Sequence, residues 1–394
     1  ADTPEAASGA LASIESVSER HAAMLERKLI KWTENPDLVD GEAPVHWRHR
    51  GRSFTAEFER VPAEDDTGLD ELMVTVRTTD DGESLVTRVR MRRLAFSNFA
   101  QFVDRWNPNV QMHDDEFEGR VHSNTSMNIQ STRDAAPTFH GKVTTTARRM
   151  QISTEGASFR RDEAFLGGIE TGVRRIKLPK HYVPFPGGGD AEPEAQEVIQ
   201  LVGNTRVRFE PDGSYRITPL DGGGPGRVGR LGKRTVYLLG SPKHSIYLSG
   251  TVDGRVLVYS PQRIVLEGSL LFAHDPVLNP DGDDFIGLVS DRTVEVATPE
   301  VTGPGDVRID ASIYAKRRFL VQRYRAPGTA LLHVYGSLSA GTLSATEPRY
   351  RTRIEFDPRL EHMRAPGFPM TDRFEITDWD GQWYEEPAAA PAEL

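Results

Sequence analysis

The spacing of hydrophobic residues predicts a small α+β region at the start of the chain. Over residues 9–32, apolar residues recur at helical spacing, which predicts an amphipathic helix. Its apolar positions are Leu11, Ile14, Val17, Leu25 and Leu29. Residues 52–96 alternate between apolar and polar instead, and Asp80-Asp81-Gly82 between two of the runs predicts a β-hairpin. We therefore expect residues 1–110 to form one helix packed on an antiparallel sheet.

Beyond residue 110 a different five-residue pattern recurs. It consists of an apolar residue, any residue, a glycine, any residue and a second apolar residue. The glycines of this frame are Gly119, Gly141, Gly250, Gly268 and Gly336. Ile309-x-Ala311-x-Ile313 repeats the frame with alanine in place of glycine. Two copies align over a longer stretch, since Ile246 and Leu248 correspond to Ile264 and Leu266. A small residue at a fixed position permits a tight corner or a close approach of neighbouring chains.

Irregular repeats of this kind predict a mainly β fold, a β-solenoid (parallel β-helix) over residues 111–370. A β-sandwich with glycine-rich turns is the alternative, but it would not need the same glycine frame so often. We expect one continuous stack over residues 115 to about 360, with the five glycines at equivalent positions and Gly268→Val strongly destabilising. Residues 371–394 are expected to form a C-terminal tail.

Composition narrows the classes of protein that remain. The formal net charge is −10 and cysteine is absent, which excludes disulfides, zinc–thiolate sites and cysteine nucleophiles. We find no apolar run long enough to span a membrane and no signal-peptide core, although the sequence begins at Ala1 without a methionine. These features fit an exported protein, and any anchor would lie upstream of Ala1.

Acidic residues suggest a candidate metal site. Asp281, Asp283 and Asp284 form the densest acidic cluster, directly after His274 and Asp275. Oxygen-rich loops bind calcium, although this spacing is not that of an EF-hand. The alternative is that the aspartates cap a turn before the next strand. No other cofactor is indicated.

Two motifs allow a catalytic interpretation beside a structural one. Calcium-dependent β-helix lyases combine aspartates with a basic residue, for which Arg263 and Arg292 are near in sequence. His122-Ser123-Asn124 suggests a nucleophile with its base, but neighbouring residues of a strand point to opposite faces. For both motifs a structural role is the simpler interpretation.

A polyanion-binding surface is a further hypothesis. Arg317, Arg318, Arg323 and Arg325 lie in a strand-like stretch with aromatic neighbours. If the stretch alternates as a strand, Arg323 and Arg325 share an outer face that could bind DNA or an acidic glycan. The alternative is a solvated face balanced by acidic side chains.

The order of several motifs resembles the PilX-like, type IV pilus-associated surface proteins. The motifs lie at residues 94–103, 117–124, 137–145, 283–289, 334–338, 356–360 and 365–369. The resemblance implies a pilin-like N-terminal region, a β-helical domain displayed outside the cytoplasm, and no established enzymatic activity. The prepilin peptidase site and the apolar half of a pilin helix are missing from the sequence given.

Taken together, these patterns predict a non-enzymatic, exported bacterial protein of the cell surface or periplasm. A pilin-like base would present a β-solenoid for adhesion, or for assembly with other pilin-like or surface subunits. The alternatives are a β-helix enzyme acting on polysaccharide, and a tip module that binds DNA or glycan.

Overall fold

The computed structural model describes residues 24–32, 43–80, 82–155, 159–183, 196–222, 224–279 and 282–386. The described chain divides into two compact units. The first contains the described residues up to Ala63, Leu69–Leu94 and those from Asp372 onward; the second contains Glu64–Gly68 and Ala95–Thr371. In the described part of the chain, no helix is both long enough and apolar enough to cross a membrane.

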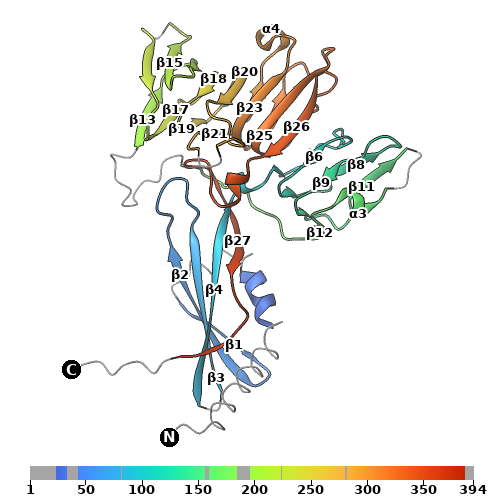
Figure 1. Cartoon of the computed structure of the whole chain (residues 1–394), viewed down its shortest axis with the longest axis vertical. Helices are drawn as coiled ribbons and strands as arrows, with labels where there is room; N and C mark the ends of the chain where they lie inside the picture. The colour runs from blue at the N-terminus through green and yellow to red at the C-terminus, as the bar shows by residue number, and fades with distance from the viewer. Residues whose placement is uncertain are drawn as a thin grey trace, which may run out of the picture. The chain divides into compact units, whose positions relative to one another are not determined.

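The first unit is an antiparallel sheet with a helical segment at residues 24–32 (Figure 1). The strands are β1 (Val45–His49), β2 (Arg52–Val61), β3 (Glu71–Asp80), β4 (Glu83–Ala95), β27 (Met370–Asp378) and β28 (Tyr384–Glu385). β3 and β4 form the expected hairpin, with Asp80 opposite Glu83. Leu25 and Leu29 are fully buried and pack in one core with β2, β3 and β4. The remainder of the predicted 9–32 helix lies outside the described residues.

Two predicted boundaries differ from the structure. The segment 95–110 belongs to the second unit, because Phe96 and Phe102 are buried there. The predicted tail is part of the first unit up to residue 386, because β28 pairs with β4 and Trp383 is 1% exposed in its core. Residues 387–394 lie outside the described residues. Trp383 is a large apolar residue in a short polar segment, so no periodic pattern indicated that this segment packs in the core.

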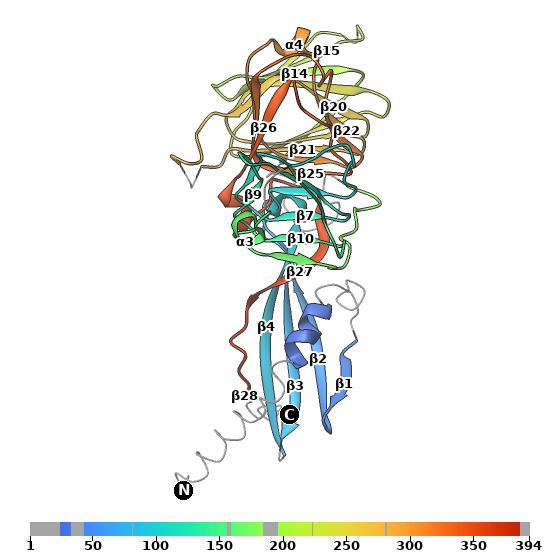
Figure 2. The same ribbon diagram turned by 90° about the vertical axis from the view of Figure 1, so that its right-hand side faces the viewer.

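The second unit is mainly β and is dominated by parallel strands. Its first parallel ladder pairs the following strands in spatial order: β13 (Gln196–Leu201), β17 (Thr235–Gly240), β19 (Arg255–Ser260), β21 (Phe285–Ser290), β23 (Val307–Ala315), β25 (Ala330–Ala340), β5 (Gln101–Val103), β7 (Val121–Ser123), β10 (Val143–Thr145) and β12 (Ile169–Thr171). Figure 2 shows β21, β25, β7 and β10 in this succession.

Two further parallel ladders accompany the first. The second contains β14 (Thr205–Phe209), β18 (Ser245–Val252), β20 (Arg263–Phe272), β22 (Thr293–Val296) and β24 (Arg318–Val321), and separately β8 (Asn128–Ser131) and β11 (Gln151–Thr154). The third contains the later parts of β18 and β20, the first parts of β23 and β25, and then β26 (Tyr350–Phe356), β6 (Glu116–Phe117) and β9 (Thr138–Phe139).

The remaining elements are short. They are β15 (Ser214–Pro219), β16 (Arg227–Arg230), α3 (Arg161–Ala164), α4 (Pro299–Thr302), η1 (Phe96–Asn98) and η3 (Pro358–Glu361). β14, β15 and β16 pair antiparallel, in contrast to the ladders. One apolar core runs along the ladders, and within it Phe117, Phe139 and Phe165 stack with ring centroids 5.1 and 5.0 Å apart.

The order of strands in space differs from the order in sequence. We expected a stack that follows the chain from residue 115 to about 360. Instead Leu338 of β25 pairs with Gln101 of β5, so the last ladder strands of the sequence lie beside the first. One end of the first ladder is formed by β12, which pairs with β10, and the other by β13, which pairs with β17, although β13 is the next strand after β12 in the chain. The repeats lie within two blocks of the sequence, residues 101–171 and 196–356, and their spacing does not reveal which ends of the two blocks pair.

The glycine frame is confirmed in part. Ala311 lies opposite Gly336, and a Cβ built on Gly141 would lie 2.2 Å from the Gly119 carbonyl oxygen, so these pairs are equivalent as expected. Gly250 and Gly268 are on paired strands, but an irregularity after Leu248 places Gly250 opposite Leu270. A Cβ on Gly268 would meet nothing within 4 Å, so the predicted damage from Gly268→Val loses its basis.

Candidate functional site

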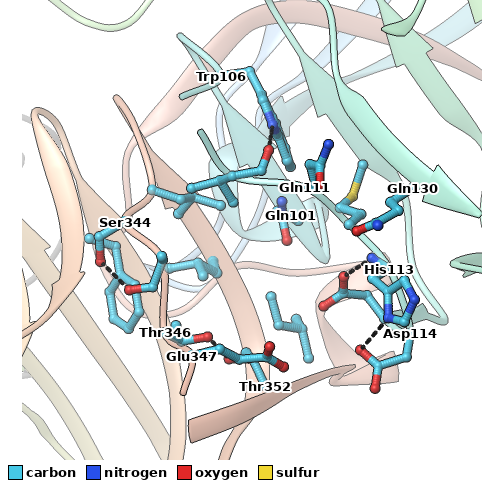
Figure 3. A pocket seen from close by; sticks show the side chains of 18 of the residues that line it. Gln101, Trp106, Gln111, His113, Asp114, Gln130, Ser344, Thr346, Glu347 and Thr352 are labelled. Atoms are coloured by element: carbon cyan, nitrogen blue, oxygen red, sulfur yellow. Dashed lines mark hydrogen bonds and ion pairs between the residues drawn. The ribbon is translucent and has the colours of Figure 1, made fainter. Parts of the chain in front are cut away.

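The second ladder is interrupted at one step, between Leu343 and Met112. On one side of the interruption Phe319 bridges Leu343, and on the other Met112 bridges Ile129. No pairing joins Leu343 to Met112 in the described part of the chain, although the first ladder is continuous at the same level through Leu338 and Gln101. A cavity of about 330 Å³ occupies this place (Figure 3). We call it the ladder-gap pocket.

Two segments and several strands position the residues that line this pocket. Residues 106–115 follow β5, residues 343–347 follow β25, and β5, β8 and β26 contribute Gln101, Gln130 and Thr352. Hydrogen bonds hold both segments: the Trp106 indole N–H donates to the Val110 carbonyl at 2.7 Å, and the Thr352 hydroxyl donates to the Thr346 hydroxyl at 2.8 Å. The pocket is therefore framed by ordered side chains of the second unit.

Gln101 points a buried amide into this cavity (Figure 3). The residue is only 2% exposed, and its backbone N–H donates to the Arg120 carbonyl. No hydrogen bond of its side-chain carboxamide is found within the described residues. Buried polar side chains normally have partners, so this carboxamide offers a donor and an acceptor to a ligand.

Three carboxylates give the pocket its charge. Asp114, Asp115 and Glu347 line it, and its described lining contains no lysine or arginine. Burial raises the pKa of Asp115 to about 6, and the neighbouring Asp114 and Glu347 carboxylates act in the same direction. The His113 backbone N–H, which donates to Asp115 Oδ2 at 3.1 Å, opposes the shift. A carboxylate whose pKa is raised by burial and by neighbouring negative charges is frequently found in a binding or catalytic site.

Replacing Asp115 by asparagine should stabilise the protein at pH 8. The carboxylate is protonated more readily in the folded state than in the unfolded one, so its cost is fully present above the folded pKa of about 6. We expect a gain of roughly 1–2 kcal/mol at pH 8 that disappears as the pH falls to about 4. Thermal melts of both proteins across this range measure it. Asp134→Asn, at an exposed position, should show no such trend; a gain independent of pH would contradict the explanation.

The predicted metal residues are not brought together as a set. Asp281 lies outside the described residues, and Asp283 is exposed. Asp284 is 1% exposed and accepts the backbone N–H groups of Gly254 at 2.7 Å and His274 at 2.9 Å. This is the turn-capping role that was weighed as the alternative.

A different group surrounds Asp284. One ligand atom each of Asp253, His274 and Asp284 lies within 4.8 Å of the others, and His274 Nδ1 is 3.0 Å from Asp284 Oδ2. This hydrogen bond and the Asp284 charge raise the pKa of His274. Asp253 could not be identified from sequence because it comes from another strand connection. Calcium binding by Asp281, Asp283 and Asp284 stays a prediction.

His122, Ser123 and Asn124 form part of a buried structural network. His122 Nδ1 is 2.7 Å from the Thr144 hydroxyl and Nε2 is 2.9 Å from Asn124 Oδ1. Asn124 also donates to the Ile176 carbonyl at 2.7 Å and accepts its N–H at 2.9 Å. Ser123 is completely buried. The network fixes the segment after β12 to the ladder.

The four predicted arginines separate into two pairs. Arg317 and Arg318 are exposed at the start of β24. Arg323 and Arg325 lie in a turn after β24, because Arg323 has a φ of +48° and leaves the strand. Arg323 forms an ion pair with Glu300, and Arg325 stacks on Tyr324. The shared strand face predicted for Arg323 and Arg325 is therefore wrong.

Arg317 and Arg318 belong instead to a larger set, which we call the arginine column. Its members lie where the chain passes from the first to the second ladder: Arg292, Arg317, Arg318, Arg105, Arg148 and Arg149. All six side chains are exposed, and none has an ion pair with a described acidic residue. Backbone bonds from Arg317 N–H to the Arg292 carbonyl, and from Arg105 N–H to the Gly341 carbonyl, show that these corners stack.

Comparisons with known proteins find a distant structural similarity. No protein-family model and no curated protein matches this sequence. Among solved structures, the chain is similar to the competence-associated pilin ComZ from Thermus thermophilus. The TM-score is 0.35 with 14% identity, covering 95% of this chain and 97% of that chain. At this distance the functional argument has to come from the residues themselves.

Proposed function

We propose that the chain is an exported, non-enzymatic bacterial surface protein of pilus-associated type. In this proposal the three parallel ladders are the faces of a β-helix, which is presented for adhesion or assembly. Its support is that short corners join successive ladders, as Asp291 and Arg292 join β21 to β22. The order of motifs that resembles the PilX-like proteins supports the pilus association.

The arginine column is the observation that carries the adhesive role. Arg292 and the Arg317–Arg318 pair stand at neighbouring corners, since neighbouring parallel strands lie about 4.8 Å apart. Arg105 and the Arg148–Arg149 pair follow further along the ladder, each after a corner without arginine, and together they add positive charge to one side of a protein of net charge −10. Arginine recognises phosphate and carboxylate groups through paired N–H donors. We therefore assign to this corner the binding of a polyanion, either DNA or an acidic glycan.

The experiment is a binding titration with a labelled DNA duplex and with heparin at about 50 and 200 mM salt. Arg317→Ala together with Arg318→Ala should weaken binding about tenfold at the lower salt and reduce the salt slope by about two, one unit for each lost phosphate contact. The native protein should lose most of its affinity at the higher salt.

Arg323→Ala together with Arg325→Ala is the matched control. It removes the same charge from the turn after β24, where the arginines already have an acidic and an aromatic partner. Its affinity should stay within about twofold of the native value. Equal losses in the two double variants would show a general charge effect, and an absence of binding by the native protein at low salt would end the adhesive proposal.

A further inference from the structure

The ladder-gap pocket exposes backbone groups of the kind that pair with a strand. Phe319 N–H donates to the Thr342 carbonyl at 3.0 Å, and Ser344 N–H donates to the Phe319 carbonyl at 3.1 Å. In a parallel pair this leaves the N–H and C=O of the residue between them, Leu343, directed to the opposite side. Neither group has a hydrogen bond within the described residues, and Leu343 lines the pocket.

The opposite wall has part of its backbone already engaged in hydrogen bonds. Met112 directs its N–H and C=O toward β8, through bonds of 3.0 Å to the Asn128 carbonyl and 2.9 Å from Gln130 N–H. The next donor toward the pocket, His113 N–H, is taken by the Asp115 carboxylate. An incoming chain would thus pair with Leu343 and meet carboxylates on its other side.

We propose that the ladder-gap pocket binds an extended peptide segment, with a lysine or arginine side chain held by Asp114, Asp115 and Glu347. The segment would pair with Leu343 along one edge, as in other cases of strand addition. This deepens the assembly role proposed above, because the segment would belong to another subunit. It is separate from the arginine column, which has the opposite charge.

Charge and shape both favour this occupant. Three carboxylates with no lysine or arginine in the described lining form a site for a cation. The unpartnered Gln101 carboxamide can bond the peptide group that Leu343 does not reach. A volume of about 330 Å³ suits a short segment, since small-ligand pockets span about 300–1,000 Å³.

Four probes separate the contribution of the lysine charge to binding from that of backbone hydrogen bonds. The first is the tripeptide acetyl-Ala-Lys-Ala-methylamide, and the second replaces lysine by norleucine, which keeps the four-carbon chain and lacks the ammonium group. The third carries N-methyl groups on its peptide nitrogens, and the fourth is butylamine, which offers the ammonium group alone. Binding to the full chain at pH 7.5 is followed by calorimetry or by NMR of the peptide.

The lysine tripeptide should bind in the millimolar range or tighter, and each of the other probes at least about fivefold more weakly. If norleucine binds equally well, the carboxylates do not recognise the charge. Equal binding of butylamine or of the N-methylated peptide would overturn strand pairing, and failure of the lysine peptide to bind at 10 mM (about 2.7 kcal/mol of binding free energy) would overturn the proposal.

Variants of the protein distinguish this site from the arginine column. Asp115→Asn should remove most of the tripeptide binding while DNA binding stays unchanged, and Asp134→Asn should preserve both. Arg317→Ala with Arg318→Ala should leave the tripeptide affinity within twofold. Tripeptide binding that survives Asp115→Asn together with Glu347→Gln would place the ligand elsewhere and overturn the assignment.

Discussion

Replacing Gly250 by alanine is expected to destabilise the second unit by about 4 kcal/mol, among the largest effects of a single substitution. Gly250 has a φ of +114°, which side chains rarely adopt, and lies opposite Phe209 in the β14–β18 ladder. The added Cβ would lie 2.0 Å from the Phe209 carbonyl oxygen, which is backbone and cannot turn aside. Urea denaturation followed by far-UV circular dichroism should show a lower midpoint.

Gly268→Ala is the matched control, on the strand that pairs with that of Gly250. Its Cβ would meet nothing within 4 Å and its φ is not in the left-handed region, so we expect a change within about 0.5 kcal/mol. The two glycines occupy the same position of the sequence frame but differ in backbone conformation and in their surroundings. Equal midpoints for the two variants would contradict the assignment of steric conflict to Gly250.

This pair of glycines also shows what the sequence could and could not predict of the fold. The spacing of 18 between the two copies predicted that Ile246 and Leu248 pair with Ile264 and Leu266, and they do. Beyond Leu248 the strands slip by two residues, which places Gly268 in the irregularity. Apolar alternation continues across such a bulge, because a shift by two residues keeps each side chain on its face.

The permuted order of the ladders had no local signal. Each block of repeats has the same inward apolar residues, whichever block it contacts. The pairing of Leu338 with Gln101 joins the strand Leu338-Ser339-Ala340 to the strand Gln101-Phe102-Val103, which have no side-chain pattern in common. Only the tertiary arrangement decides which ends pair. Hydrophobic spacing therefore predicted parallel strand pairing but not the order of the strands along the ladder.

The candidate sites were harder to predict than the strands. The sequence shows that Asp114 and Asp115 are acidic. It does not show that the ladder lacks a pairing between Leu343 and Met112, which only the three-dimensional structure reveals. All four arginines of the hypothesis are exposed, but Arg323 and Arg325 share no strand face because a positive φ at Arg323 ends the strand there. The sequence did not indicate Arg105 and Arg148, because they are far in sequence from Arg317 and Arg318 and reach the same side only through the ladder.

Replacing Arg349 by methionine is expected to cost about 3–4 kcal/mol of stability. Arg349 is 4% exposed and joins the corners after β22 and β24, since one guanidinium nitrogen donates to both the Ala297 and Gln322 carbonyls. The other donates to the Thr302 hydroxyl at 2.7 Å, and the group lies 4.8 Å from the Tyr350 ring centroid. Methionine retains much of the volume but leaves the buried carbonyls without donors.

Arg351→Met is the matched control, because Arg351 is an exposed residue only two positions further along the chain, in β26, and should change stability by less than about 0.5 kcal/mol. Arg349→Lys should fall between the two, since an ammonium can reach one carbonyl but cannot reproduce the planar fork of donors. The urea midpoints of the three variants test this order. If Arg349→Met and Arg351→Met unfold at the same concentration, the buried guanidinium contributes only packing, and the corners of this unit are held by the apolar core alone.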